Sequence, residues 1–344
     1  MPNADTLDGP GLLAIPADQP ERLFSGPDAV AGEFKALAKR WHPDRGGDGD
    51  VFAHVNVLWQ AAKDRVAKGS WKVPGLAVFT GKDGREKRVR YFREFDAGVG
   101  PGYIGTSMVS YAAAPDCADL MDSAAMILSD MIIPDEKLAR IMDTRIPKVV
   151  ALTPVQDHIL MVLKRDPESV RARDLLEHVG GKLDPRHVAW VMSDLMHWAC
   201  VLGVLRLTHN DLSLDTVFIN PRQHSTSVVG GWWHASRVGE RMARKQAART
   251  VRNAPGAVLA SKVSSPATDL TLVRLLGREL LGDPSGMRLP ADSSIPKPMA
   301  DWLRLASGGD AIAEYRHWAS VLQASFGARR FIELAITPSD IYGG

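Results

Sequence analysis

The sequence predicts an α+β protein of two domains, in which a small all-helical hairpin precedes a larger domain with strands first and helices later. Three observations support this prediction. Two amphipathic stripes at helical spacing lie within residues 21–70. Short apolar segments separated by glycine-rich turns follow over residues 76–113, and helical patterns dominate from Asp184 onward. A length of 344 residues also suits two domains better than one.

Composition and charge exclude several classes of protein. Lys and Arg number 42 against 40 Asp and Glu, so the net charge of +2 gives no general attraction to nucleic acids or anionic membranes. Cys117 and Cys200 match no metal-ligand or disulfide spacing, which predicts two thiols in a reducing compartment. Residues 1–20 lack a signal-peptide pattern, and no apolar run is long enough to span a bilayer. We expect a cytoplasmic protein with no metal site, no membrane partner and no nucleic-acid partner.

The N-terminal region begins with a segment rich in Pro, Gly and Asp. This composition favours turns and predicts a flexible lead-in over residues 1–20. Beyond it, Phe34, Leu37 and Trp41 recur at helical spacing, and this helix ends near Trp41 because Pro43 restrains the residue before it. A second stripe follows a short polar turn and comprises Phe52, Val55, Leu58 and Trp59. Two such helices joined by a short loop predict an antiparallel hairpin.

The hairpin carries the motif His42-Pro43-Asp44 between its two helices. Over roughly residues 20–68, the motif and the apolar pattern on both sides of it resemble the J domain of Hsp70 co-chaperones. The resemblance implies that the three motif residues bind an Hsp70 of the DnaK type and stimulate its ATPase, without catalysis by this chain. A small basic surface beside the motif suits an acidic partner and comprises Lys35, Lys39, Arg40 and Arg45. The alternative is that the motif only terminates a helix and that the basic residues only form a solvated face.

A larger domain is expected after a linker at residues 71–75, and residues 336–344 are assigned to a tail. Strands are expected at 76–79, 89–92, 108–111, 148–152 and 158–163, and helices at 117–131, 184–205, 267–281, 298–307 and 310–325. Strands before helices indicate a sheet-rich front lobe and a helical rear lobe.

A second motif follows the long helix that starts near Asp184. The run His209-Asn210-Asp211-Leu212 precedes an apolar strand and resembles the His-Arg-Asp-Leu catalytic loop of protein kinases. Residues 228–235 lie where a kinase has a strand that ends in its metal-binding Asp-Phe-Gly, and Asp269 lies where a kinase helix braces the catalytic loop. The resemblance implies a bilobal protein-kinase-like domain at 76–335, with an N-lobe at about 76–163 and a C-lobe at about 169–335.

Most residues that phosphoryl transfer requires are missing from this second domain. In kinases, Mg²⁺ is held by a loop Asn and by the Asp of Asp-Phe-Gly, and a Lys–Glu pair orients the nucleotide. The chain has Thr216 and Gly231 at the two metal positions. The strand at 109–113 contains no lysine, and the helix at 120–125 contains no glutamate. Asp211, the position of the kinase base, is retained, either as a structural acceptor for loop amides or as the base of an atypical active kinase.

We therefore expect a pseudokinase that binds an unknown client or targets the co-chaperone, with no cofactor. ATP and Mg²⁺ become cofactors only if Asp211 supports an active kinase. A third possibility is a scaffold that stimulates no Hsp70. A glycine-rich turn formed by Gly98, Gly100 and Gly102 could cover phosphates but is more typical of an ordinary turn. The basic run at 237–252, in the place of a kinase activation segment, is interpreted as a solvated face.

Overall fold

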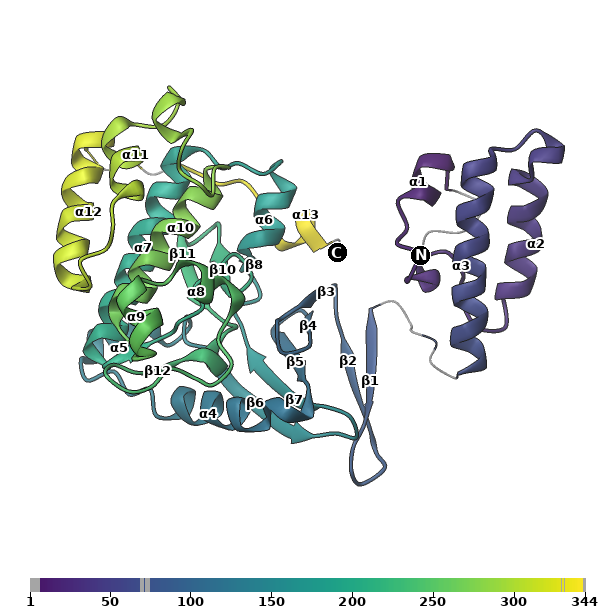
Figure 1. Ribbon diagram of the computed structural model, residues 1–344, viewed down its shortest axis with the longest axis horizontal. Coiled ribbons are helices and arrows are strands. Elements are labelled where there is room, and N and C mark those ends of the chain that lie inside the picture. Colours follow the sequence, from purple (N-terminus) through teal and green to yellow (C-terminus); the bar gives the residue numbers. More distant parts are fainter. Residues whose placement is uncertain (1–6, 69–70, 72–74, 329, 331, 343–344) are drawn as a thin grey trace. The chain divides into compact units, whose positions relative to one another are not determined.

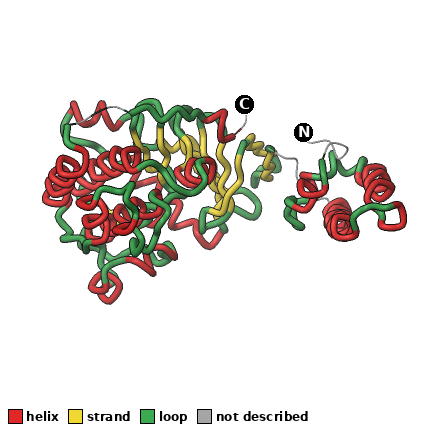
Figure 2. The backbone as a smooth tube through the Cα atoms, turned by 90° about the horizontal axis from the view of Figure 1, so that it is seen from above, coloured by secondary structure: helices red, strands yellow, loops and turns green. Residues whose placement is uncertain are grey.

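A computed structural model describes residues 7–68, 71, 75–328, 330 and 332–342. The chain divides into two compact units, which consist of residues 1–78 with 87–90 and of residues 79–86 with 91–344. Helices dominate the described part of the N-terminal unit, whereas the larger unit combines a sheet with a helical half (Figures 1 and 2). None of the helices within the described ranges is long and apolar enough to cross a membrane.

The helices described in the N-terminal unit are α1 (Gly9–Leu13), α2 (Val30–Trp41) and α3 (Gly49–Ala67). The two longer helices are those expected from the apolar stripes, and α2 lies alongside α3 (Figure 1). Phe34 of α2 stacks on Trp59 of α3 with ring centroids 4.0 Å apart. The buried core of this unit comprises Leu12, Ile15, Leu23, Phe24, Val30, Leu37, Val51, Val55, Leu58 and Ala62.

The expectation of a flexible lead-in over the first twenty residues is wrong for residues 7–20. The Asp8 carboxylate caps α1 by accepting a hydrogen bond from the backbone N–H of Gly11, the third residue of the helix. Leu12 and Ile15 are buried in the core, and His54 of α3 hydrogen-bonds the carbonyl oxygen of Ile15 at 2.8 Å. Pro and Gly are compatible with this short helix because the first turn of a helix needs no internal backbone donors.

The segment expected to link the two domains is partly described. Trp71, which the sequence assigns to the linker, packs against the core of the N-terminal unit, and residues 72–74 lie outside the described residues. Next comes a two-stranded sheet of β1 (Leu76–Thr80) and β2 (Glu86–Arg90).

The first half of the larger unit contains a five-stranded antiparallel sheet among its described residues. In spatial order, its strands are β3 (Arg93–Asp96), β4 (Pro101–Ile104), β5 (Met108–Ala113), β7 (Ile159–Lys164) and β6 (Lys148–Pro154). Helix α4 (Ala118–Ser129) lies against β6 and β7, and α5 (Glu136–Met142) follows it. The strand expected at 89–92 is wrong, because β2 ends at Arg90 and β3 begins only at Arg93. Gly102 is expected in a turn but lies within β4.

The second half of the larger unit is mainly helical and packs around α7 (Pro185–Val204). Asp184 caps this helix and Pro185 occupies its first position, which suits a residue without an N–H group. Helices α10 (Pro266–Leu280) and α12 (Ala311–Phe326) pack against α7, as the apolar patterns predict. Four further α-helices lie in this half: α6 (Ala172–His178), α8 (Ala248–Asn253), α9 (Gly256–Ser261) and α11 (Lys297–Arg304). One small sheet contains β8 (Val170–Arg171), β10 (Val217–Asn220) and β11 (Ser225–Val228). A second contains β9 (Leu207–Thr208) and β12 (Ser236–Arg237).

The described residues of the predicted tail are packed onto the larger unit. Helix α13 (Pro338–Tyr342) contacts α6, and Ile336, Ile341 and Tyr342 lie against the hydrophobic core. The sequence does not reveal this packing, because a helix of five residues is too short to show an apolar period.

Candidate functional site

The turn between α2 and α3 fixes the positions of His42, Pro43 and Asp44. Helix α2 ends before Pro43, and His42 adopts an extended backbone with φ −64° and ψ 131°. The Nδ1 atom of His42 accepts a hydrogen bond from the backbone N–H of Asp44 at 3.2 Å, and Gly46 reverses the chain at φ 82°. The side chains of His42 and Asp44 are 40% and 87% exposed. A constrained turn therefore presents both side chains to solvent.

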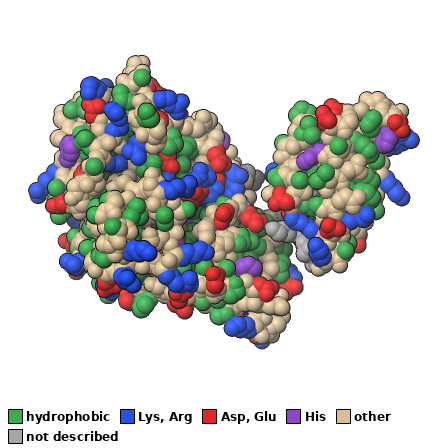
Figure 3. Space-filling model, viewed as in Figure 1, with side chains coloured by type: hydrophobic (Ala, Val, Ile, Leu, Met, Phe, Trp, Pro, Cys, Tyr) green, Lys and Arg blue, Asp and Glu red, His purple; other side chains and the backbone are tan. Residues whose placement is uncertain are grey.

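The basic residues predicted beside this motif are exposed. Lys35 and Lys39 lie one turn apart on α2. The guanidinium of Arg40 lies 5.1 Å from the centroid of the Trp41 ring, and Arg45 follows the motif directly. Figure 3 shows basic side chains at the edges of the N-terminal unit. These basic side chains thus lie beside a turn that also carries the exposed carboxylates of Asp44, Asp48 and Asp50.

In the larger unit, the loop that follows α7 is held by a buried carboxylate. Asp269, near the start of α10, accepts hydrogen bonds from the backbone N–H groups of His209 at 2.7 Å and Asn210 at 2.8 Å. Burial lowers the pKa of His209 to about 3, so its imidazole is neutral at pH 7. The neutral ring donates from Nε2 to the carbonyl oxygen of Gly230 at 2.9 Å. These bonds connect the loop to both α10 and the segment that follows β11.

Asp211 lines a cavity with a volume of about 910 Å³. Burial raises the pKa of its carboxyl group to about 8; Arg249 lowers this pKa, while Asp215 and Asp269 raise it further. The carboxyl group is therefore mostly protonated at pH 7. A protonated carboxyl group is a poor general base and a poor metal ligand.

The two positions at which a kinase holds Mg²⁺ offer no available oxygen. The Thr216 hydroxyl donates to the carbonyl oxygen of Asp211 at 2.6 Å and accepts from the N–H of Ser213 at 3.0 Å. Both hydrogen bonds stay within the loop at residues 211–216. Gly231 has φ 84°, and a β-carbon there would lie 2.6 Å from Cε1 of His209. Among the residues that the structure describes, no group of three or more His, Cys, Asp or Glu could hold a metal ion. The residues present do not fit a kinase Mg²⁺ site.

The strand and helix that the kinase resemblance assigns to the nucleotide-orienting Lys–Glu pair carry a tyrosine and an ion pair. Tyr111 of β5 faces the segment that follows β11: a β-carbon on Gly230 would lie 2.7 Å from the Tyr111 hydroxyl oxygen. Its ring packs edge-on against Trp233, with centroids 4.9 Å apart. On α4, Asp119 pairs with Arg244 at 2.8 Å. Tyr111 and Asp119 carry no positive charge, and the Arg244 guanidinium is paired with Asp119.

The glycines in and beside the β3–β4 turn have backbone or packing roles: a positive φ at Gly98 and close contacts at Gly100 and Gly102. Gly98 has φ 74°, and its N–H donates to the Asp96 carboxylate at 2.8 Å. A β-carbon on Gly100 would overlap the carbonyl group of Ala112, and one on Gly102 would lie 2.5 Å from the Phe95 ring. These glycines therefore do not by themselves indicate a phosphate site.

Charges of both signs line the cavity, and many are paired with one another. Arg173 donates to both carboxylate oxygens of Asp215 at 2.5 and 2.6 Å, and Arg249 pairs with Glu279 at 2.5 Å. Lys245 also lines the cavity. These pairs reduce the charge that the cavity offers to a ligand.

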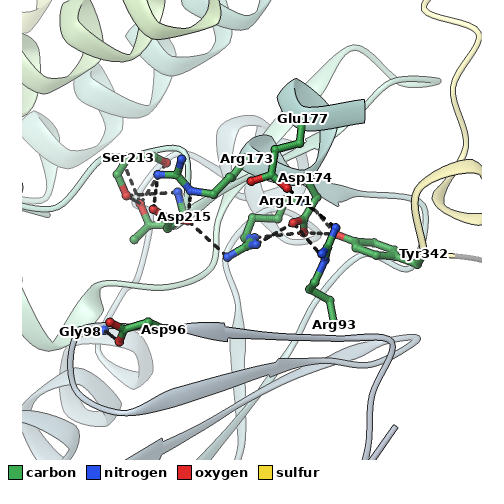
Figure 4. Close-up of polar contacts among 11 residues, drawn as sticks. Arg93, Asp96, Gly98, Arg171, Arg173, Asp174, Glu177, Ser213, Asp215 and Tyr342 are labelled. Atoms are coloured by element: carbon green, nitrogen blue, oxygen red, sulfur yellow. Dashed lines mark hydrogen bonds and ion pairs between the residues drawn. The ribbon is translucent and has the colours of Figure 1, made fainter. Parts of the chain in front are cut away.

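Arg171 is the main site residue that the sequence does not predict. Its side chain is buried, and its guanidinium lies 4.2 Å from the centroid of the Phe95 ring. It donates to both carboxylate oxygens of Asp174 at 3.0 and 2.6 Å and to Asp215 at 3.3 Å. Figure 4 shows Arg171 between the strand of Arg93 and the loop of Asp215. No motif marks this set of contacts, because Phe95 and Asp215 come from segments far from Arg171 in the sequence, although Asp174 lies only three residues away.

The basic run at residues 237–252 is divided between exposed and paired side chains. Arg237, Arg241 and Arg252 are exposed, which agrees with a solvated face. Arg244 and Arg249 instead form the ion pairs described above, so they hold the segment against α4 and α10.

Comparison with known proteins identifies the fold of the larger unit. No protein-family model and no curated protein matches the chain. A solved structure of vaccinia related kinase 3 matches it with a TM-score of 0.52 and 15% sequence identity, and the match covers 74% of this chain and 92% of that chain. At this identity, the likeness concerns the fold alone. The sheet, the helical half and the loop at His209 occur in the order that the kinase resemblance implies. The chain therefore contains a protein-kinase-like fold.

Proposed function

We propose that the chain is a J-domain co-chaperone whose kinase-like unit lacks kinase activity and serves as a scaffold for a client protein or as a targeting unit. The N-terminal unit recruits an Hsp70 of the DnaK type in the cytoplasm and stimulates its ATPase through His42, Pro43 and Asp44. The observation that carries this proposal is the constrained turn that exposes His42 and Asp44 between two packed helices.

Electrostatics supports an acidic partner for this turn. The exposed side chains of Lys35, Lys39 and Arg45 lie close to the motif in sequence and carry positive charge beside it. Complementary charge steers association and is screened by salt. We therefore expect that raising the ionic strength weakens the interaction with Hsp70.

A single-turnover ATPase assay tests this part of the proposal. The full chain, His42→Gln and His317→Gln are each added to a bacterial Hsp70 loaded with ATP. The control residue His317 is an exposed histidine of α12 in the larger unit. We expect several-fold acceleration with the wild type and the control and none with His42→Gln. No acceleration by the wild type, or full acceleration by His42→Gln, would instead favour a scaffold that does not stimulate Hsp70.

The absence of kinase activity is supported by the metal positions. Thr216 uses its hydroxyl within the loop, Gly231 has no room for a side chain, and Asp211 is mostly protonated at pH 7. We expect no change in melting temperature when the chain is heated with Mg-ATP, because ligand stabilisation requires occupancy. A shift of several degrees that Asp211→Ala abolishes would favour an atypical kinase with ATP and Mg²⁺ as cofactors.

A further inference from the structure

We propose that residues 336–342 form an intramolecular strap that holds Arg171 in the cleft and so excludes nucleotides from the space beside Phe95. This inference goes beyond the proposed function, because it concerns access to the cleft rather than metal ligands or Hsp70. The strap has a local cap: the N–H and the hydroxyl of Thr337 both donate to the Asp340 carboxylate, at 2.8 and 2.7 Å.

Tyr342 anchors the strap at the edge of the cleft. Its hydroxyl oxygen accepts a hydrogen bond from the backbone N–H of Arg171 at 3.0 Å, and the hydroxyl donates to Oδ2 of Asp174 at 3.0 Å. Its ring lies nearly parallel to that of Phe92, at an interplanar angle of 13° and a centroid distance of 6.1 Å. One side chain thus contacts both the chain beside β3 and the start of α6.

Asp174 transmits this contact to the cleft. Its carboxylate is fully buried and binds the Arg171 guanidinium at both oxygens, while Nε of Arg93 lies 3.4 Å away. A buried carboxylate depends on every donor around it, because an unsatisfied buried charge is costly. The Tyr342 hydroxyl therefore helps to hold Asp174 in place, and Asp174 in turn fixes Arg171.

Arg171 lies against two residues that line the cavity, Phe95 and Asp215, and so bounds the cavity on that side. Its guanidinium lies over Phe95, the residue just before the Asp96 that starts the glycine turn, and it reaches Asp215 in the loop that follows β9. In kinases, the glycine-rich turn covers the nucleotide and the catalytic loop lies opposite. A planar cation that bridges these two elements narrows the cleft between them. Figure 4 shows this connected path from Tyr342 through Asp174 and Arg171 to Asp215.

Hydrogen–deuterium exchange on the full chain tests the strap. Tyr342→Phe removes only the hydroxyl group, and a chain that stops after residue 335 removes the whole strap. Tyr315→Phe is the matched control, since the Tyr315 hydroxyl also forms a hydrogen bond, at 3.0 Å from Nε2 of His197. We expect several-fold faster exchange at residues 93–96 and 171–178 in the first two variants and wild-type rates in Tyr315→Phe. Unchanged exchange in both Tyr342→Phe and the shortened chain would overturn the proposal.

Nucleotide binding tests what the strap excludes. ADP and adenosine without Mg²⁺ are titrated into each chain by calorimetry. The wild type and Tyr315→Phe should show no binding at about 1 mM, and the shortened chain should bind at least one probe about tenfold more tightly than this limit. Equal binding by the wild type and the shortened chain, or faster exchange without any gain in binding, would overturn the exclusion of nucleotides. If circular dichroism shows that the shortened chain is unfolded, Tyr342→Phe decides both measurements.

Discussion

Replacing Asp211 with asparagine is expected to stabilise the protein at neutral pH. Burial is the main reason that the pKa of this carboxyl group rises from 3.8 to about 8. Between these two values, the folded protein keeps a proton that the unfolded chain releases. The contribution of this carboxyl group to the free energy of unfolding is fully present below about pH 4 and is lost as the pH rises toward 8. Asparagine has a similar shape and does not ionise, so it removes this loss.

The magnitude follows from proton linkage. A group protonated only in the folded state changes the free energy of unfolding by about 1.4 kcal/mol per pH unit, or about 4 kcal/mol between pH 4 and pH 7. Asp211 is partly exposed to the cavity, and water there relieves part of this cost. We therefore expect Asp211→Asn to raise the free energy of unfolding by about 2–3 kcal/mol at pH 7, against a typical total of about 5–15 kcal/mol.

Urea unfolding at several pH values between 5 and 8 measures this difference. The wild type should lose stability with rising pH, and Asp211→Asn should follow a flatter curve. Asp215→Asn is the control with the opposite sign: Asp215 binds Arg173 and Arg171, and its loss should cost about 1–3 kcal/mol. Parallel curves for the wild type and Asp211→Asn, or an asparagine variant less stable at pH 7, would refute a protonated Asp211.

Three further substitutions test packing. Leu12→Ala should lower the free energy of unfolding by about 2–5 kcal/mol, because Leu12 is buried. An unchanged urea midpoint would instead support a flexible segment at residues 7–20. Gly47→Ala places a β-carbon on the backbone of Trp41, so stimulation of Hsp70 and helical circular dichroism should both fall. Arg274→Met leaves the buried Glu314 carboxylate, now paired at 2.5 Å, without its partner; we expect a loss of about 3–5 kcal/mol in urea unfolding, partly recovered by adding Glu314→Gln.

Elements with a clear period can be predicted from the sequence, because periodicity is a local property. The helices α7, α10 and α12 are examples. Errors occur where local composition and packing disagree. Residues 7–20 contain the turn-forming residues of a flexible segment, yet Leu12 and Ile15 are buried against α3, which begins more than thirty residues later. The short α13 shows no period at all, although the Tyr342 hydroxyl is hydrogen-bonded to the backbone of Arg171.

The sequence by itself determines the α+β class, the contiguous His42 motif and the presence of Thr216 and Gly231 where the kinase resemblance expects metal ligands, because each depends on residue identity or local spacing. Only the tertiary structure decides that burial raises the pKa of Asp211 and that Arg171 lies against the Phe95 ring. Burial, hydrogen bonding and ion pairing depend on neighbours from distant segments, and no local pattern in the chain encodes which segments folding brings together.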